Sequence, residues 1–304
     1  MGFNKRFLKN HMASKITSRQ RAETLLEALP YLQSFRGGIF LIKYGGSTME
    51  ATDQVALFLE DVAFLDAVGI KVVLVHGGGK AINTRMKERG LIPQFVNGLR
   101  VTDAATIEIV RSVLDEEVNQ EIVTQLGKLG VKALGISGTT IFTANKLPPV
   151  KIPDGRKIDL GFVGEAEQAN PNPVRQALDA GSVPVISPLG ATPTGEAMNI
   201  NADVSAAALA AALPATKLIF LSDVPGLMRD PQDPNSLIHG LTASQTEELI
   251  ERGIIAGGMI PKVRSATKAL SNGLGKVHLL GASVPHAVLL EAFTEEGVGT
   301  EILP

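Results

Sequence analysis

The chain contains the stretch Ile39-Phe40-Leu41-Ile42-Lys43-Tyr44-Gly45-Gly46-Ser47, which sets the fold class. Its apolar residues follow one another without alternation, which is typical of a parallel strand buried on both faces. Lys43 stands where this strand ends, and the glycines after it let backbone N–H groups approach a ligand closely. In an open α/β sheet, ligands bind beyond the carboxyl ends of the strands. A lysine followed by two glycines at that edge predicts an anion site, and phosphate is the expected anion.

A second strand-to-helix turn repeats this arrangement. Residues 72–75 form another apolar run, and His76-Gly77-Gly78-Gly79-Lys80 leads from it into a helical pattern. The carboxyl ends of parallel strands meet at one edge of a sheet, so both glycine-rich turns are expected in the same crevice.

Neither turn matches the common nucleotide fingerprints. A Walker A loop ending at Lys80 would need glycine at position 74 and Ser or Thr at 81, where the chain has Leu74 and Ala81. A dinucleotide-binding loop that starts at Gly77 would need glycine at position 82, where the chain has Ile82. A hydride-transferring dehydrogenase is therefore a weak alternative.

The composition excludes several classes of function. With 29 basic and 31 acidic residues among 304, no Trp and two Tyr, the chain lacks the charge and the stacking platforms of a nucleic-acid-binding protein. The absence of cysteine excludes disulfides, thiol nucleophiles and thiolate metal sites, and the histidines show no metal-ligand spacing. No apolar run approaches the roughly 20 residues of a membrane span. We expect a soluble, cytoplasmic α/β protein, as one broad unit or two lobes.

The first 36 residues predict a basic tail followed by a helix. Six Lys/Arg and no acid between residues 1 and 21 favour a solvated tail, and an organelle transit segment over residues 1–18 is the alternative. A helix over 19–35 is expected to end near Pro30. Its apolar stripe consists of Ala22, Leu25, Leu26 and Leu29. Because this helix precedes the first strand, its stripe either meets a partner subunit or packs on its own domain.

The middle of the chain predicts a lid and a polar site. Asn97-Gly98 within residues 94–102 indicates a hairpin that covers the crevice, with Arg100 on its returning arm suited to a carboxylate. Thr102-Asp103 caps a long helix to about Lys128. The β-like runs at 132–145 and 157–164 suggest antiparallel additions at an edge. Asn199 and Asn201 alternate with apolar residues before Asp203, which begins the next helix and indicates a polar site rather than a simple helix carboxylate.

The last third of the chain places a lysine near a helix N-terminus, where negative charge is normally favoured. After Pro214, buried strands are predicted at 217–221 and 277–280, with a final edge strand after Thr300. The helix that opens at Gly258-Met-Ile-Pro-Lys262 places Lys262 near its N-terminus. A cation there opposes the helix dipole unless an anion is bound, so Lys262 is a candidate functional residue.

Six motifs in this order resemble those of the N-acetylglutamate kinases of the amino acid kinase family, from about residue 20 to the C-terminus. They are Lys43-Tyr-Gly-Gly, His76-Gly-Gly-Gly, Asn97-Gly-Leu-Arg-Val-Thr, Asn199-Ile-Asn-Ala-Asp203, Ser222-Asp-Val-Pro-Gly and Gly258-Met-Ile-Pro-Lys262. The resemblance implies an open three-layer αβα sandwich with a mainly parallel central sheet. It implies a basic tail and interaction helix (1–36), an N-terminal lobe that binds acetylglutamate and carries the lid (37–213), and an ATP-binding C-terminal lobe (214–304).

The resemblance also implies a reaction and its catalytic residues. The γ-phosphoryl group of MgATP would pass in line to the side-chain carboxylate of N-acetyl-L-glutamate, a step of arginine biosynthesis. Lys43 and Lys262 would flank the phosphoryl group, Asp203 would hold both lysines, and backbone N–H groups of the glycines would bind its oxygens. Those glycines are Gly45, Gly46 and Gly78. An ionised carboxylate is already a nucleophile, so no general base is needed.

Binding residues follow from the same resemblance. Arg100, Asn199 and the backbone of Gly78-Gly79 would hold the acetylglutamate. The nucleotide-binding residues would be Asp223, Val224, Pro225, Gly226, Leu227, Met228, Ile254, Ile255 and Ala256. Mg²⁺ would be held mainly by phosphates and water, without a dedicated protein site.

Arginine-inhibited members of the family carry an N-terminal helix that pairs dimers into a hexamer, a trimer of dimers. Their arginine site corresponds here to His278, Glu291 and Gly297 to Thr300, with Arg229 as a basic neighbour, and a guanidinium needs a carboxylate such as Glu291. The resemblance therefore implies feedback inhibition by L-arginine. The alternative is that Glu291 has no binding role and lies on a solvated helix face. Photosynthetic members are also controlled by the nitrogen-signalling PII protein, which leaves PII open as a partner.

The chain departs from the family pattern in places, and two alternatives stay open. Lys80 stands where relatives often have an uncharged residue, and Arg229 replaces a lysine of some inhibited members. The chain could be a kinase of the same fold that acts on aspartate or carbamate. It could also be a catalytically silent binder of nucleotide or arginine, although keeping Lys43, Lys262 and Asp203 together argues against this.

Overall fold

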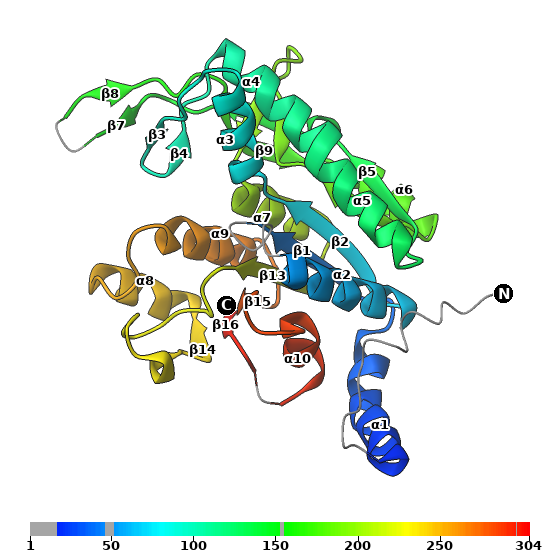
Figure 1. Cartoon of the computed structure of the whole chain (residues 1–304). Coiled ribbons are helices and arrows are strands. Elements are labelled where there is room, and N and C mark those ends of the chain that lie inside the picture. The colour runs from blue at the N-terminus through cyan, green and yellow to red at the C-terminus, as the bar shows by residue number, and fades with distance from the viewer. Residues whose placement is uncertain (1–16, 46–51, 153–154, 296) are drawn as a thin grey trace.

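A computed structural model describes residues 17–45, 52–152, 155–295 and 297–304. An eight-stranded sheet lies at its centre, with helices on both faces (Figure 1). The sheet consists of β1 (Ile39–Tyr44), β2 (Lys71–His76), β5 (Ala133–Ile136), β10 (Val183–Ile186), β13 (Lys217–Ser222), β14 (Gly240–Thr242), β15 (Val277–Gly281) and β16 (Thr300–Leu303). The helices are α1 (Ser18–Phe35), α2 (Thr52–Ala67), α3 (Gly79–Glu88), α4 (Ala104–Arg111), α5 (Asn119–Lys128), α6 (Asn172–Asp179), α7 (Ala202–Ala212), α8 (Ala243–Glu251), α9 (Met259–Ser271) and α10 (Ala287–Phe293), with a π-helical segment η2 (Ser112–Val118) and the short 3₁₀ turns η3 (Gly138–Thr140) and η4 (Pro234–Ser236).

The first apolar run lies at the centre of the sheet. The strand order is β14-β16-β15-β13-β1-β2-β10-β5, and β1 pairs in parallel with both β2 and β13. Among the pairs of this sheet, the one between β15 and β16 is antiparallel and the others are parallel. The predicted αβα architecture with a mainly parallel sheet is confirmed.

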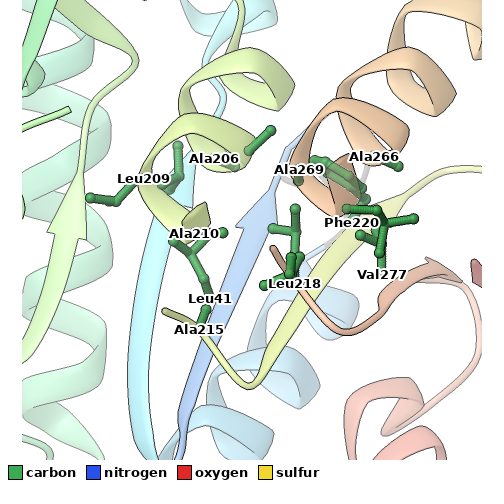
Figure 2. Packing of buried hydrophobic residues seen from close by; sticks show 14 of the residues in the cluster. Leu41, Ala206, Leu209, Ala210, Ala215, Leu218, Phe220, Ala266, Ala269 and Val277 are labelled. Atoms are coloured by element: carbon green, nitrogen blue, oxygen red, sulfur yellow. The ribbon is translucent and has the colours of Figure 1, made fainter. Parts of the chain in front are cut away.

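Each face of the sheet has its own hydrophobic core. On one face, α7 and α9 cover strand residues such as Leu41, Leu218 and Phe220 (Figure 2). Alanines of these two helices, Ala206, Ala210 and Ala266 among them, are fully buried in this layer. On the other face, α2, α5 and α10 cover the alternate residues of the same strands. Small side chains let α7 and α9 lie close to the sheet and to each other, which positions the first turns of both helices.

The expected antiparallel additions at an edge were wrong in their placement. β5 joins the main sheet in parallel with β10. A separate four-stranded closed barrel contains β6 (Phe142–Lys146), β9 (Val163–Ala169), β11 (Leu189–Ala191) and β12 (Ala197–Ile200). The final strand β16 is also not at an edge, because β14 pairs outside it. These pairings join segments far apart in the chain, and no local pattern records them.

The N-terminal helix continues beyond its expected end. Thr17 and Gln20 form a capping box at the start of α1, and the helix runs through Pro30 to Phe35. An exposed helix tolerates this proline because water can bond the carbonyl whose partner is missing. The apolar stripe is exposed, with Leu25 and Leu26 each 66% accessible. The end of α1 touches the domain, where the Phe35 ring meets those of Phe40 and Phe293.

The predicted hairpin and the long helix are confirmed as elements, while the role of the hairpin as a lid stays a prediction. β3 (Phe95–Val96) and β4 (Leu99–Arg100) pair in antiparallel, with positive φ at Asn97 and Gly98 in the turn. A second hairpin, β7 (Val150–Lys151) with β8 (Lys157–Ile158), lies beside it in Figure 1. Asp103 caps α4, and the helix runs to Lys128. The π-helical turn within it was not anticipated.

Candidate active site

Two buried lysines share one carboxylate at the carboxyl edge of the sheet. Lys43 comes from the end of β1, Asp203 from the first turn of α7 and Lys262 from the first turn of α9. The Lys43 Nζ lies 3.0 Å from Oδ1 of Asp203, and the Lys262 Nζ lies 2.9 Å from Oδ2. Asn201 caps α7 by accepting from the backbone N–H of Asp203, which fixes the start of that helix. Three distant segments thus meet in one cluster with an excess positive charge.

The electrostatics of this cluster favour an anion. Burial alone would raise the pKa of Asp203, but the charges and hydrogen bonds of Lys43 and Lys262 outweigh it and hold the pKa at about 2. Burial, together with repulsion from Lys43, lowers the pKa of Lys262, and Asp203 opposes this shift. The Lys262 ammonium also lies 5.3 Å from the ring centre of Phe220. One carboxylate for two cations leaves a site that a phosphoryl group would neutralise.

The two glycine turns lie against each other beside Lys43. The Gly77 N–H donates to the Tyr44 carbonyl at 2.7 Å. A Cβ built on Gly45 would stand 3.2 Å from Gly77 and from Nζ of Lys43, so a side chain there would crowd the cluster. A Cβ on Gly78 would collide with the Leu114 side chain. Close approach therefore explains glycine at these positions, while the predicted residue Gly46 lies outside the described residues.

Thr102, which the sequence indicated only as part of a helix cap, links Arg100 to Asn199. The Thr102 hydroxyl donates to the Arg100 carbonyl at 3.0 Å and accepts from Nδ2 of Asn199 at 3.3 Å. The Arg100 guanidinium is buried and donates to the carbonyl of Gly79 at 3.0 Å. The Phe95 ring of the β3–β4 hairpin lies 4.7 Å from the guanidinium carbon. Arg100, Asn199 and the second glycine turn are thus brought together.

The predicted nucleotide-binding residues occupy two segments. Residues 223–228 follow β13, and 254–256 lie between α8 and α9. Strand β13 pairs in parallel with β1 and ends at Ser222, so the first segment begins at the same edge of the sheet as the lysine cluster. Gly226 has φ of 157° and Leu227 donates its N–H to the Thr300 hydroxyl at 2.8 Å. The nucleotide-binding role of every residue in these two segments, from Asp223 to Met228 and from Ile254 to Ala256, stays a prediction.

Among the predicted arginine-site residues, His278, Glu291 and Gly297 form a second buried polar group. Arg229 is not part of this group. His278 Nδ1 donates to Oε1 of Glu291 at 2.7 Å, and Glu291 Oε2 accepts from the N–H of Val298 at 3.0 Å. Gly297 lies against the same carboxylate, because a Cβ there would stand 3.4 Å from Oε2. Glu291 is therefore not on a solvated helix face. Within the described residues, the Arg229 guanidinium pairs with no carboxylate.

Sequence reasoning missed four polar residues that the structure places at these groups. Lys217, which starts β13, lies 3.4 Å from Nε2 of His278 and 4.9 Å from the Phe35 ring centre. Thr102 links Arg100 to Asn199, and His76 and Asn119 contact each other behind the second glycine turn. A lysine within an apolar strand was the one signal that could have marked Lys217.

The described residues contain neither a metal cluster nor a membrane-spanning helix. No group of three or more His, Cys, Asp or Glu side chains in the described ranges could hold a metal ion. In the same part of the chain, no helix is long and apolar enough to cross a membrane.

Comparison with known proteins identifies a family. Residues 38–281 match the model of the amino acid kinase family. An acetylglutamate kinase of Methanocaldococcus jannaschii is 47% identical over 93% of this chain and 96% of its own length. An acetylglutamate kinase of Syntrophomonas wolfei is 43% identical over 95% of this chain and 99% of its own.

Solved structures share the fold. An N-acetylglutamate synthase of Neisseria gonorrhoeae, complexed with coenzyme A and N-acetyl-glutamate, superposes with a TM-score of 0.79 at 27% identity. The match covers 93% of this chain and 63% of the synthase chain. The same synthase complexed with coenzyme A and L-arginine gives a TM-score of 0.76 at 26% identity.

We predict that Asp203→Asn destabilises the protein by about 3–5 kcal/mol at pH 7, because it leaves two buried ammonium groups uncompensated. Urea unfolding measures the difference. Replacing the whole cluster, with Lys43→Met, Asp203→Leu and Lys262→Met together, should recover most of that loss. An Asp203→Asn protein as stable as the wild type would contradict the shared-carboxylate cluster.

The difference in free energy of unfolding between the wild type and Asp203→Asn is expected to depend on pH. The pKa of Asp203 falls from an ordinary 3.8 to about 2 in the folded state. A depressed carboxyl pKa contributes stability that is full above the unfolded value and lost as the pH falls through the folded value. The advantage of the wild type over Asp203→Asn should therefore shrink between pH 4 and pH 2.

Proposed function

Since the chain belongs to the amino acid kinase family and is 47% and 43% identical to two acetylglutamate kinases, we propose that it transfers the γ-phosphoryl group of ATP in line to the side-chain carboxylate of N-acetyl-L-glutamate. The observation that carries this proposal is the pair of buried lysines on Asp203, at 3.0 and 2.9 Å, beside two glycine turns. A cluster with one uncompensated cation suits a transferring phosphoryl group, which carries negative charge on its equatorial oxygens.

The chain's own residues would supply charge and alignment rather than proton transfer. Lys43 and Lys262 would flank the phosphoryl group, and Asp203 would keep both ammonium groups in place between turnovers. Backbone N–H groups of Gly45, Gly46 and Gly78 would hydrogen-bond the equatorial oxygens. The acceptor is an ionised carboxylate, so no described histidine is needed as a base.

Acetylglutamate would bind beside the second glycine turn. Arg100 would hold a carboxylate of the substrate, and Asn199 with the Gly78-Gly79 backbone would hold its polar groups. The contacts of the Thr102 hydroxyl support this assignment, because they link the Asn199 side chain to the backbone of Arg100, whose guanidinium donates to the Gly79 carbonyl. The lobe of residues 37–213 would thus carry the acid substrate.

ATP would bind in the lobe of residues 214–304, along 223–228 and 254–256. Mg²⁺ would stay on the nucleotide phosphates and water. When bound, the ion would neutralise part of the negative charge of the phosphates.

The first test combines an activity assay with a lysine substitution. Acyl phosphate formed from ATP and N-acetyl-L-glutamate is trapped with hydroxylamine. We expect Lys262→Ala to lower kcat by about 100-fold or more with KM for acetylglutamate within about threefold, because the lysine contacts the transferring group. Lys268→Ala, an exposed lysine on the same helix, is the control and should keep wild-type kcat.

Three other results of this assay would contradict the proposed activity or the proposed role of Lys262. An unchanged kcat in Lys262→Ala would remove the proposed role of that lysine. Wild-type activity on aspartate or carbamate alone would favour the related kinases. A folded wild type that binds ATP and phosphorylates none of these acids would favour the silent binding module.

We further propose that L-arginine inhibits the enzyme by binding near His278, Glu291 and residues 297–300. The support is the carboxylate of Glu291, whose side chain is 7% exposed and which a guanidinium could pair with, and the L-arginine complex of the fold-related synthase. Lys217 joins this group to the end of α1 through Phe35. Glu291→Gln should weaken arginine inhibition at least about tenfold with kcat kept, because the charged pair is lost. Glu295→Gln, an exposed neighbour, should leave inhibition intact, and equal inhibition of both variants would refute the site.

We also propose that α1 pairs dimers into a hexamer. Its stripe of Leu25, Leu26 and Leu29 is exposed in the single chain and suits burial against a second copy of the helix. Leu25→Glu should convert hexamers to dimers in sedimentation velocity, because it places a charge in the paired stripe. Thr24→Glu lies on the opposite side of α1 and should preserve the hexamer. Identical sedimentation of the two variants would overturn the pairing role.

A further inference from the structure

A buried histidine stands directly before the second glycine turn and has no part in the reaction proposed above. His76 ends β2 and is 0% exposed. Its Nδ1 lies 2.8 Å from the carbonyl oxygen of Gly77, and its Nε2 lies 3.2 Å from Nδ2 of Asn119. Asn119 is the first residue of α5, and 2% of its surface is exposed.

These contacts fix one tautomer of the imidazole. A carbonyl oxygen can only accept, so Nδ1 carries the proton and donates it to Gly77. Nε2 then has a free lone pair and accepts from the Asn119 amide. That amide also donates to the Val185 carbonyl at 2.9 Å, and turning it over would set its oxygen against that carbonyl. Both amide hydrogens and both ring nitrogens are therefore used.

Burial keeps this imidazole neutral. It lowers the pKa of His76 to about 4, although the hydrogen bond to Gly77 and the charge of Asp115 act in the opposite direction. A second proton on Nε2 would also face the donating amide of Asn119. The Nδ1 proton is thus held permanently at neutral pH, as a donor rather than an acid.

The π-helical segment η2 supports the same turn from behind. Its Leu114 side chain fills the space where a Cβ on Gly78 would stand. Its Asp115 accepts from the hydroxyls of Ser137 at 2.9 Å and Ser187 at 2.5 Å, beyond the ends of β5 and β10. Asn119 follows the segment directly, so the wide turn sets where α5 begins.

We propose that His76, held by Asn119, is a positioning residue that aims the Gly78 N–H at the transferring phosphoryl group. The Gly77 carbonyl and the Gly78 N–H belong to one planar trans peptide and point in opposite directions. Fixing the carbonyl on His76 therefore fixes the direction of the N–H. This inference rests on the proposed role of Gly78 in phosphoryl transfer.

Substitutions at His76 separate positioning from packing. Asparagine places its Nδ2 near the site of the histidine Nδ1 and keeps the donor to Gly77, whereas leucine fills the space without a donor. We expect His76→Asn to keep kcat within about tenfold of the wild type and His76→Leu to lower it about 100-fold, on the scale of one lost oxyanion donor. KM for acetylglutamate should change less than kcat in both, because Arg100 and Asn199 are untouched.

A packing role predicts the opposite order. Leucine is apolar and suits a fully buried position better than asparagine, so a structural residue would tolerate His76→Leu more readily. Equal kcat values in folded samples of the two variants, or a higher value in His76→Leu, would overturn the proposal.

A spectroscopic measurement tests the same idea without turnover. In ¹⁵N-histidine-labelled wild type at pH 7, the resonances that disappear in His76→Asn belong to His76. We expect the Nδ1-protonated neutral tautomer, and an Nε2-protonated ring or an imidazolium would overturn the proposal. Absence of wild-type activity on N-acetyl-L-glutamate would instead refute the proposed function, and the spectrum would still decide the state of His76.

Discussion

The structure depends on a single carboxylate that holds two buried ammonium groups. Asp203 receives Lys43 from β1 and Lys262 from α9 at 3.0 and 2.9 Å, so three segments that are far apart in the sequence must reach the same point. Burial of one uncompensated cation is costly, and a protein built only for stability would have no reason to keep it. The cluster is therefore best understood as half of an interaction whose other half is an anion. An incoming phosphoryl group would supply that half, and the rest of the fold keeps the lysines from separating before it arrives.

Small side chains make this meeting possible. The alanines of α7 and α9 let the two helices pack closely over β1 and β13, and both helices begin at the edge where β1 ends. Each helix places its first turn beside the end of β1, where backbone N–H groups favour negative charge. The charged cluster and the apolar layer beneath it are thus one arrangement, because a larger side chain in that layer would move Asp203 or Lys262 along with its helix.

The sequence predicted the elements whose signals are local and missed those that depend on distant partners. The apolar runs of β1 and β2 and the Asn97-Gly98 turn carry their own patterns, and Lys262 stood out because a cation opposes a helix N-terminus. β14 is three residues long and pairs with β16 from the far end of the chain, so no window of sequence contains that pairing. Pro30 indicated a helix end, yet exposure made the missing hydrogen bond tolerable.

The same limit applies to polar residues. Thr102 looked like part of a cap, and its role as a link between Arg100 and Asn199 depends on its bridge to Gly161 and on the pairing of β12 with β9. His76 read as part of a glycine motif, although its partner Asn119 lies 43 residues away, just after a π-helical turn that no periodicity indicated.

Strand β13 places the two proposed sites on opposite faces of one element. Lys217 at its start faces His278 and the Phe35 ring on the side of α10, while Phe220 lies under the Lys262 ammonium on the side of α9. Alternate residues of a strand point to opposite faces, so both contacts belong to the same short backbone. A change that shifts β13 along its axis would alter both contacts at once. Arginine bound beside Glu291 would therefore need no long pathway to reach Lys262, because one buried strand already touches both groups.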